Sequence, residues 1–313
     1  MKVIIVSGPT ATGKTDISIE LARQFGGEVV NFDSLLLYKE ITIGTAKPTS
    51  LEQGEIPHHM INVASISQPM NAAAYAKMAL PIINQLHEKN KLVYLVGGSG
   101  FYLQALLQGM YDSPTTPKEI SERSDKLYQE LGINPFLEIL AQHDPATLNR
   151  YHANDHYRVR RAVEHFWNTG TPLSEVRSKK DEENQSREQS NVHGWDVLHL
   201  HLDVPKEEHS EIIKNRTKKM LLSGLIREVQ DLLGEGFTGN EKPLQSIGYK
   251  EVIDLERGLL KSEAECMERI IVSTRQLAKS QRTWFNRIQG KVSLHPILNK
   301  ALVLDSVHKF IHL

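Results

Sequence analysis

Cysteine is nearly absent from the 313-residue chain, since Cys266 is the only one. A single cysteine excludes an intrachain disulfide and any zinc site that needs two or more thiolates, so a reduced, intracellular setting is the expectation. An excess of either charge is also missing, because 37 Lys and Arg balance 38 Asp and Glu to a net charge of −1. A uniformly basic surface is therefore excluded, and any nucleic-acid contact must come from locally clustered charge.

Long apolar runs are missing as well. The N-terminus has only four successive apolar residues, Val3 to Val6, before Ser7, which is too short a run for a signal peptide or a membrane span. No other segment reaches 18 uninterrupted apolar residues, so we expect a cytoplasmic protein with no membrane partner. The length predicts roughly two domains, and 40% apolar residues are enough for a real core.

Short β-branched runs alternate with helical patterns over the first hundred residues. The best strand candidates are residues 3–6, 28–32 and 92–96, and residues 197–204 alternate like a further strand. The continuous apolarity of the first three segments predicts strands that are buried on both faces, as in a parallel sheet with crossover helices.

A run of short helices with explicit start signals begins at about residue 113. Thr116-Pro117 combines an N-cap with a proline at the first helical position, and Asn134-Pro135 and Asp144-Pro145 start helices in the same way. A further helix runs from about Asp155 to Asn168 and stops at Gly170. Residues 178–190 contain no apolar residue, so we expect a solvated loop there.

These patterns divide the chain into two predicted domains. Residues 1–112 and 196–313 form an α/β core, and residues 113–195 are an all-helical insertion. The final third is predicted to be mostly helical, with a long helix that begins at the capping box Ser262 to Glu265.

A phosphate-binding loop follows the first predicted strand. Residues 8–15 match G-x-x-x-x-G-K-[ST] and precede a helical run, which is the context that this motif requires. The fold class is therefore predicted as α/β, with a P-loop NTPase-like parallel sheet flanked by helices. The loop alone does not distinguish ATP, GTP or another diphosphate. Its residues are Gly8, Pro9, Thr10, Ala11, Thr12, Gly13, Lys14 and Thr15.

One carboxylate is well placed near this loop. NTP hydrolysis by this fold usually needs a second apolar strand that is followed by an acidic residue. Residues 92–96 are instead followed by Gly97-Gly98-Ser99-Gly100. Asp33 directly follows residues 28–32. It is therefore expected at the carboxyl end of a parallel strand, where ligand-binding sites in such sheets cluster. Asp33 could be a metal ligand, a general base or only an N-cap.

At this point the sequence resembles the tRNA dimethylallyltransferase family, also called tRNA isopentenyltransferases. The matching blocks follow family order across about 280 of the 313 residues. Eukaryotic members often add a C-terminal zinc finger, which a single cysteine excludes, so the chain resembles the bacterial type. After the phosphate-binding loop, the blocks are DSLLLYKEITIGTAKP (33–48), GGSGFY (97–102), NDHYRVRRAVE (154–164), NRTKKMLLSGLIREV (215–229), QSIGYKE (245–251) and RQLAKSQRTWF (275–285).

The resemblance implies transfer of a dimethylallyl group from dimethylallyl diphosphate to the exocyclic amine of the adenosine 3′-adjacent to the anticodon of certain tRNAs. The phosphate-binding loop and Arg216 would hold the diphosphate, with Mg²⁺ on the Thr15 hydroxyl. Asp33 matches the general base of the family. Ser99 stands where the family usually has Thr and would contact the target nucleotide.

The resemblance also implies that the helical insertion binds the tRNA anticodon stem-loop. We expect the protein to act as a monomer. Two residues depart from the family pattern, because Leu36 replaces a usual Gln and Thr42 replaces a usual Asp. A Leu side chain cannot hydrogen-bond to a base edge as Gln can. RNA recognition by the residues around Leu36 would then depend on neighbouring backbone groups. The expected RNA contacts are Asp33, Ser34, Leu35, Leu36, Ser99, Arg123, Tyr157, Arg158, Val159, Arg160, Arg161, Arg275, Lys279 and Arg282.

Helical spacing predicts a basic stripe in the insertion. Arg158, Arg161 and His165 share one face of their helix, opposite a core face of Val159, Ala162, Val163 and Phe166. Phosphates or unstacked bases are the expected partners of the stripe. Arg160 is predicted to pair with Glu164 at i+4.

A second basic stripe lies in the long C-terminal helix. Arg275, Lys279 and Arg282 share one face and could touch the RNA backbone or line the donor pocket, which spacing cannot distinguish. Ile270, Leu277, Trp284 and Ile288 lie on a different side, and we expect Trp284 and Phe285 to be core residues rather than platforms for base stacking.

Three other functions fit parts of the sequence. An adenylate isopentenyltransferase would use the same loop but act on free AMP, although the helical insertion argues against it. A small-molecule kinase would place ATP in the loop and use Asp33 to deprotonate a hydroxyl. A catalytically weakened RNA-binding module is made conceivable by Leu36 and Ser99.

Overall fold

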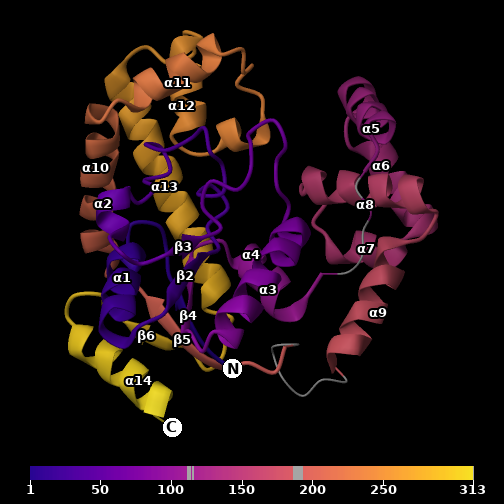
Figure 1. Cartoon of the computed structure of the whole chain (residues 1–313). Coiled ribbons are helices and arrows are strands. Elements are labelled where there is room, and N and C mark those ends of the chain that lie inside the picture. The colour runs from indigo at the N-terminus through magenta and orange to yellow at the C-terminus, as the bar shows by residue number, and fades with distance from the viewer. Residues whose placement is uncertain (111–113, 115, 186–192, 313) are drawn as a thin grey trace. The chain divides into compact units, whose positions relative to one another are not determined.

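The computed structural model describes residues 1–110, 114, 116–185 and 193–312 (Figure 1). The chain forms two compact units. The first comprises Met1–Leu107 with His193–Leu313, and the second comprises Gln108–Val192. None of the helices in the described ranges is long and apolar enough to cross a membrane.

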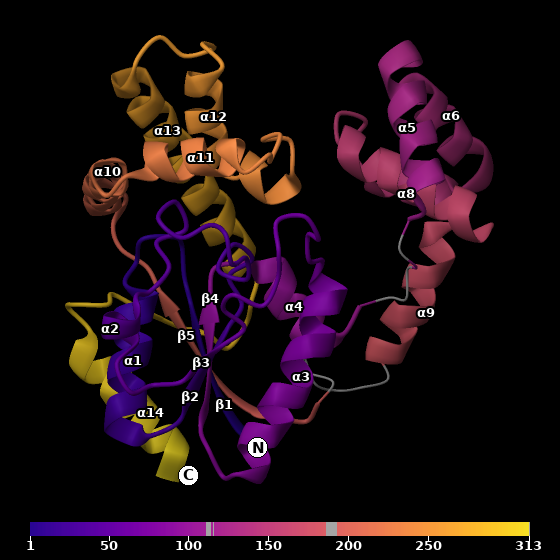
Figure 2. The same ribbon diagram turned by 45° about the horizontal axis from the view of Figure 1, so that its top comes forward.

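The first unit is built on a six-stranded parallel sheet, which confirms the predicted fold class (Figure 2). The strand order is β3-β2-β4-β1-β5-β6. The two edge strands, β3 and β6, were not predicted, because two or three residues are too short to show a pattern. The strands are β1 Lys2–Ser7, β2 Glu28–Asn31, β3 His58–His59, β4 Val93–Gly97, β5 Asp196–Leu202 and β6 Val292–Leu294.

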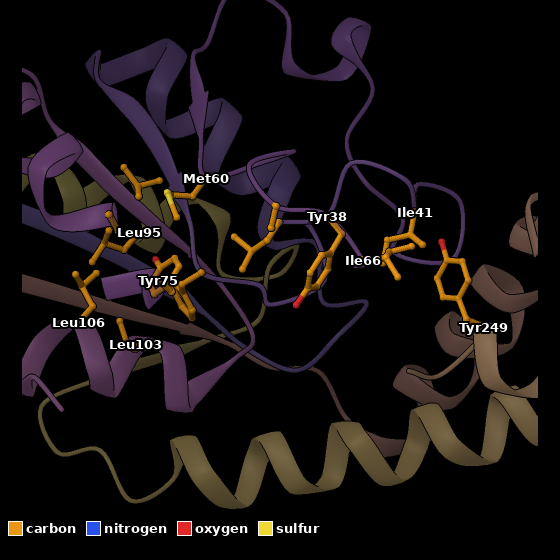
Figure 3. Packing of buried hydrophobic residues seen from close by; sticks show 14 of the residues in the cluster. Tyr38, Ile41, Met60, Ile66, Tyr75, Leu95, Leu103, Leu106 and Tyr249 are labelled. Carbon is orange, nitrogen blue, oxygen red and sulfur yellow. The ribbon is translucent and has the colours of Figure 1, made fainter. Parts of the chain in front are cut away.

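Helices cover both faces of this sheet, as the apolar strands predicted. Ile4 and Val6 of β1 pack in one cluster with α1 (Lys14–Phe25) and α14 (Lys300–His312). Val3 and Ile5 point to the opposite face and its cluster, which α3 (Ala72–Glu88) and α4 (Gly100–Gln108) cover. Figure 3 shows part of this second cluster, with Tyr75 of α3 near Leu95 of β4.

The remaining helices of the first unit come mainly from the last third of the chain, as predicted. The longest, α13 (Glu263–Phe285), begins where the Ser262 hydroxyl accepts from the Glu265 N–H at 3.2 Å. α13 packs beside α10 and α12. The others are α2 Ser50–Gln53, α10 Lys206–Leu222, α11 Leu225–Gly234, the short 3₁₀ helix Lys242–Gln245 and α12 Tyr249–Glu256.

In the residues of the second unit that the structure describes, all regular structure is helical. Two helices begin at the predicted prolines, and the Asp144 carboxylate caps one of them by accepting from the Thr147 N–H at 3.0 Å. The core contains Phe136, Leu140, Val159 and Val163, all fully buried. The helices are α5 Lys118–Leu131, α6 Asn134–His143, α7 Pro145–Arg150, α8 His156–Thr169 and α9 Leu173–Gln185.

Two local predictions for this unit were wrong. Pro117 is the N-cap of α5 rather than its first residue, and the Thr116 hydroxyl accepts from Arg161 instead of capping the helix. Residues 178–185 are helical and not a loop, while residues 186–190 lie outside the described ranges. Lys, Glu and Gln are strong helix formers, so the absence of apolar residues indicated solvation and not irregular structure.

Candidate active site

Four loops of the first unit meet at the carboxyl ends of the parallel strands, where ligands bind in open α/β sheets. The phosphate-binding loop follows β1, Asp33 follows β2, residues 97–100 follow β4 and Asp203 follows β5. Two cavities of about 570 and 560 Å³ lie at this edge. The residues that line both cavities are Thr10, Asp33, Thr45, Arg216 and Met220.

The phosphate-binding loop lines the second of these cavities, which we call the loop cavity. Gly13 adopts φ 74° and leads into α1, so the first amides of the helix are available to an anion. The Pro9 carbonyl accepts from the Thr12 hydroxyl at 2.9 Å and from the Lys14 ammonium at 2.7 Å, which closes the turn. The loop therefore has the form of an anion-binding turn at a helix N-terminus.

Lys14 and Arg216 are two of the basic residues that line the loop cavity. Burial lowers the pKa of Lys14 to about 8, although Asp33 opposes this and Arg216 adds to it. Burial also lowers the pKa of the Arg216 guanidinium, and Asp33 again opposes the shift. Arg216 lies on α10, and within the described ranges its one hydrogen bond is a long one of 3.5 Å to the Thr45 carbonyl. Both charges can therefore meet a bound anion.

A magnesium ion would have to share its ligands with the diphosphate. Among the described residues, no group of three or more His, Cys, Asp or Glu side chains could hold a metal alone. Thr15 and Asp33 line the loop cavity, and Mg²⁺ commonly binds to one or two protein oxygens plus substrate phosphates. The residues present fit an ion that arrives with its substrate.

Asp33 lies in a tight turn rather than at the start of a helix, so the N-cap alternative was wrong. Asn31 fixes the turn, since its side chain accepts from the Asp33 N–H at 2.8 Å and donates to the Asp33 carbonyl at 3.0 Å. Oδ1 of Asp33 accepts from the Leu35 N–H at 3.1 Å. Asp33 lines both cavities, and Oδ2 has no protein partner in the described part of the chain.

Ser99 joins the loop after β4 to this turn. Its hydroxyl accepts from the Ser34 N–H at 3.0 Å and donates to the Ser34 hydroxyl at 3.2 Å. Ser34, Leu35 and Ser99 line the 570 Å³ cavity, which we call the acceptor cavity, whereas Leu36 lines the loop cavity. The structure thus brings these predicted residues together with Asp33 and Arg216.

Aromatic and apolar side chains also line the acceptor cavity. Phe285 is fully buried, as predicted, but Trp284 is only half-buried and lines the cavity. Its ring lies so close to Gly100 that a Cβ there would be 2.2 Å from the indole. Leu277 is 39% exposed and also lines the cavity.

The basic stripe of α13 divides into two parts. Arg275 and Lys279 are exposed. Arg282 instead donates through Nε to the Asp203 carboxylate at 2.8 Å and contacts Nδ1 of His209 at 2.6 Å. Nε2 of His209 in turn donates to the Thr10 carbonyl at 2.7 Å. Arg282 therefore supports the phosphate-binding loop indirectly, through His209.

The basic stripe of α8 differs from its prediction in one member. The side chain of Arg158 is 64% exposed and pairs with Asp155 at 2.9 Å, and that of Arg161 is 45% exposed. His165 is buried, and this burial lowers its pKa, so its predicted place in the stripe was wrong. Tyr157 is exposed, whereas the Val159 side chain is fully buried and leaves only its backbone for a partner.

The predicted pair of Arg160 and Glu164 is also absent. Glu164 pairs with Arg161 at 2.6 Å, one helical turn away. Arg160 instead contacts Asp125 and lies over the Tyr128 ring, 4.6 Å from its centroid. Arg123 lies 4.1 Å from the centroid of Trp167. Arg160 and Arg123 therefore have structural partners within the second unit.

The sequence analysis did not single out two residues of the site. Lys47 lines the loop cavity and donates to the Tyr38 carbonyl and to Asn62, both at 2.6 Å. Gln281 lines the acceptor cavity beside Thr10. Both lie inside blocks that carried the family resemblance, which was the available signal, but their spacing implied no particular chemistry.

The chain is similar to proteins of one family. The family model described as IPP transferase matches residues 36–288. A protein of Geotalea uraniireducens (strain Rf4) named tRNA dimethylallyltransferase 2 is 38% identical over 292 residues, which cover 92% of this chain and 90% of that protein. The chain therefore belongs to the IPP transferase family, a family of enzymes, and the resemblance is confirmed.

Solved structures agree with this assignment. A tRNA isopentenylpyrophosphate transferase from Staphylococcus epidermidis matches with a TM-score of 0.69 and 32% identity, covering 99% of both chains. A eukaryotic dimethylallyltransferase acting on tRNA matches with a TM-score of 0.74 and 30% identity, covering 91% of this chain and 69% of that chain.

Proposed function

We propose that the protein modifies tRNA by transferring a dimethylallyl group from dimethylallyl diphosphate to the exocyclic amine of the adenosine 3′-adjacent to the anticodon. Relatives that act on tRNA support the substrate class. The observation that carries the detailed proposal is the position of Asp33 and Arg216, which line both the loop cavity and the acceptor cavity. A diphosphate in one cavity and an adenine in the other would meet at these residues.

The loop cavity suits the leaving group. Breaking the allylic C–O bond places negative charge on the diphosphate, and Mg²⁺ bound with the donor would neutralise part of it. The helix amides, Lys14 and Arg216 stabilise the same charge from fixed positions. Removing one such preorganised contact typically costs about a hundred- to a thousandfold in rate.

Asp33 suits the role of general base. The adenine amine is a poor nucleophile because its lone pair is delocalised into the ring, so a proton must leave as the new C–N bond forms. Oδ1 of Asp33 is held by the Leu35 N–H, which orients Oδ2 for the incoming amine. A carboxylate within hydrogen-bond reach of the amine can accept this proton.

A transfer assay separates this proposal from its rivals. The protein is incubated with labelled dimethylallyl diphosphate and Mg²⁺, together with either unmodified tRNA or AMP. Label in the tRNA adenosine supports the proposal. Label in AMP alone would indicate an adenylate isopentenyltransferase, and tRNA binding without transfer would indicate an RNA-binding module.

The kinase alternative needs a second reaction mixture. ATP replaces the labelled donor, and release of inorganic phosphate or phosphorylation of a small hydroxyl compound is followed. We expect neither, since residues 97–100 after β4 lack the acidic residue that usually holds the metal for NTP hydrolysis.

A further inference from the structure

Gln281 of α13 connects two loops of the active site with the two ends of its amide. Its Oε1 accepts from the Thr10 N–H at 2.8 Å, and its Nε2 donates to the Gly98 carbonyl at 3.0 Å. Thr10 belongs to the phosphate-binding loop after β1, and Gly98 belongs to the loop after β4. One side chain therefore bridges two strand ends that no covalent connection holds together locally.

The surroundings of the bridge are closely packed. A Cβ at Gly98 would lie 2.6 Å from Nε2 of Gln281 and 3.3 Å from the Gly8 carbonyl oxygen. Any side chain at this position would therefore have to displace the amide. On the other side of Thr10, His209 holds the carbonyl at 2.7 Å. Both backbone groups of Thr10 are thus fixed by side chains from helices.

The bridge continues to the turn that carries Asp33. The residue after Gly98 is Ser99, whose hydroxyl accepts from the Ser34 N–H at 3.0 Å. Ser34 follows Asp33 directly. A continuous path of hydrogen bonds and short peptide segments therefore links the loop that holds the leaving group with the turn that holds the base.

We propose that Gln281 is a positioning residue for the transfer, which sets the distance between the phosphate-binding loop and the Asp33 turn. This inference rests on the proposed function. Displacement at carbon requires the leaving oxygen, the reacting carbon and the nitrogen in line, and a displacement of about 1 Å can cost about a hundredfold in rate. Gln281 acts through the backbone of both loops and leaves the reacting atoms to Asp33, Lys14 and Arg216.

The first test is the kinetics of Gln281→Ala. We expect kcat to fall about 10- to 100-fold, since both loops keep their own side chains but lose their fixed spacing. The KM for tRNA should stay near the wild-type value. Thr283→Ala is the matched control, because Thr283 is exposed on the same helix and its hydroxyl donates only to the Lys279 carbonyl. Its kinetics should be those of the wild type.

The second test uses Gly98→Ala, which displaces the amide without changing Gln281. Alone it should lower kcat by a factor similar to that of Gln281→Ala. In the Gln281→Ala background it should lower kcat much less than it does alone, because Nε2 is gone and of these two contacts only the 3.3 Å one with the Gly8 carbonyl oxygen remains. Should Gln281→Ala fail to fold, the single Gly98→Ala variant still tests the proposal through the same fall in kcat.

Four outcomes would overturn the proposal. A raised tRNA KM at unchanged kcat would make Gln281 an RNA contact, and a lowered melting temperature with wild-type kinetics would make it only structural. A wild-type kcat in Gly98→Ala would contradict the bridge, as would fully additive losses in the double variant. If the wild-type protein transfers no label to tRNA, the proposed function itself fails, which is a separate result.

Discussion

At the scale of single residues, we expect Lys14 to make anion binding by the phosphate-binding loop sensitive to pH. Burial lowers its pKa to about 8, so the ammonium is charged below this pH and neutral above it. The affinity for inorganic pyrophosphate should therefore fall as the pH rises from about 7 to about 9. Titration calorimetry across this range measures the effect.

Lys14→Arg is the control for this prediction, because a guanidinium stays charged over the whole range. The variant should lose the part of the pH dependence that Lys14 causes, whatever the ionisation of pyrophosphate itself contributes. An equally steep fall in the variant would show that another group titrates.

Two buried histidines make the fold sensitive to acid. The Ser7 hydroxyl contacts Nε2 of His199 at 2.7 Å and Nδ1 of His201 at 3.0 Å, beneath the phosphate-binding loop. Burial lowers the pKa of His199 to about 3 and that of His201 to about 4, below the value of about 6.5 in an unfolded chain. The unfolded state therefore binds more protons, and stability should fall as the pH drops below about 6.5.

Urea unfolding at about pH 7.5 and about pH 5 tests this prediction. The double variant His199→Gln/His201→Gln removes both titrating groups and should lose less stability between the two conditions than the wild type. An equal loss in both proteins would assign the acid sensitivity to carboxylates elsewhere.

The positions of individual residues could be predicted where a motif follows a particular strand, and they were predicted wrongly where packing decides. The phosphate-binding loop and Asp33 could be located because their residue types must follow particular strands. His165 and Arg282 carry the right charge at the right spacing, yet the first is buried and the second is bound by Asp203. Helical spacing gives the direction of a side chain but not what covers it.

At the scale of elements, α11 anchors the segment that contains Lys47. The Glu228 carboxylate accepts from the N–H groups of Thr42 at 3.1 Å and Ile43 at 2.9 Å, and from the Tyr249 hydroxyl at 2.5 Å. Removing this acceptor leaves several donors without a partner. Glu228→Ala should therefore destabilise the protein by about 1–3 kcal/mol, measured by denaturant unfolding.

Glu235→Ala is the control for this element, since Glu235 is exposed at the end of the same helix. Its stability should lie within about 0.5 kcal/mol of the wild type. If both variants were equally stable, the anchoring role of Glu228 would be wrong.

Helix starts could be predicted better than helix ends or short strands. Pro135, Asp144 and Ser262 mark starts because proline and capping side chains satisfy local backbone requirements. The extension of α9 to Gln185 was missed because a polar helix has no apolar period to reveal it. The strand β3 has only two residues, and its pairing with β2 depends on distant sequence.

At the scale of the whole molecule, the helical unit is predicted to hold RNA while the α/β unit holds the donor. Tyr157 and Arg158 are exposed on α8. Tyr157→Ala and Arg158→Ala should each raise the KM for tRNA and leave that for dimethylallyl diphosphate unchanged. Arg158→Ala should also reduce the slope of log affinity against log salt by about 1, because one phosphate contact is lost.

Arg227→Ala controls for the loss of a positive charge, since Arg227 is an exposed residue of α11 paired with Asp231 at 2.9 Å. Its salt slope should match that of the wild type. A change in donor KM for the α8 variants, with tRNA KM unaltered, would contradict the division of roles.

The parallel sheet could be predicted from four apolar strands separated by helical patterns. Their order, β2-β4-β1-β5, could not, because it depends on which strands pair across the whole chain. The two cavities are a property of this order, since residues that follow β1 and β2 line both of them together with residues at the end of β4. The sequence placed Asp33 near the phosphate-binding loop, but only the fold shows it lining both cavities.

The most direct test of the account is single-turnover transfer from labelled dimethylallyl diphosphate to tRNA by wild type, Asp33→Ala and Asp33→Asn. The Asn side chain keeps an acceptor for the Leu35 N–H, so it removes the base while retaining the turn. Both variants should lose at least about a hundredfold in rate, with nearly unchanged affinities for tRNA and pyrophosphate. Transfer at the wild-type rate in either variant would contradict the assignment of Asp33 as the base.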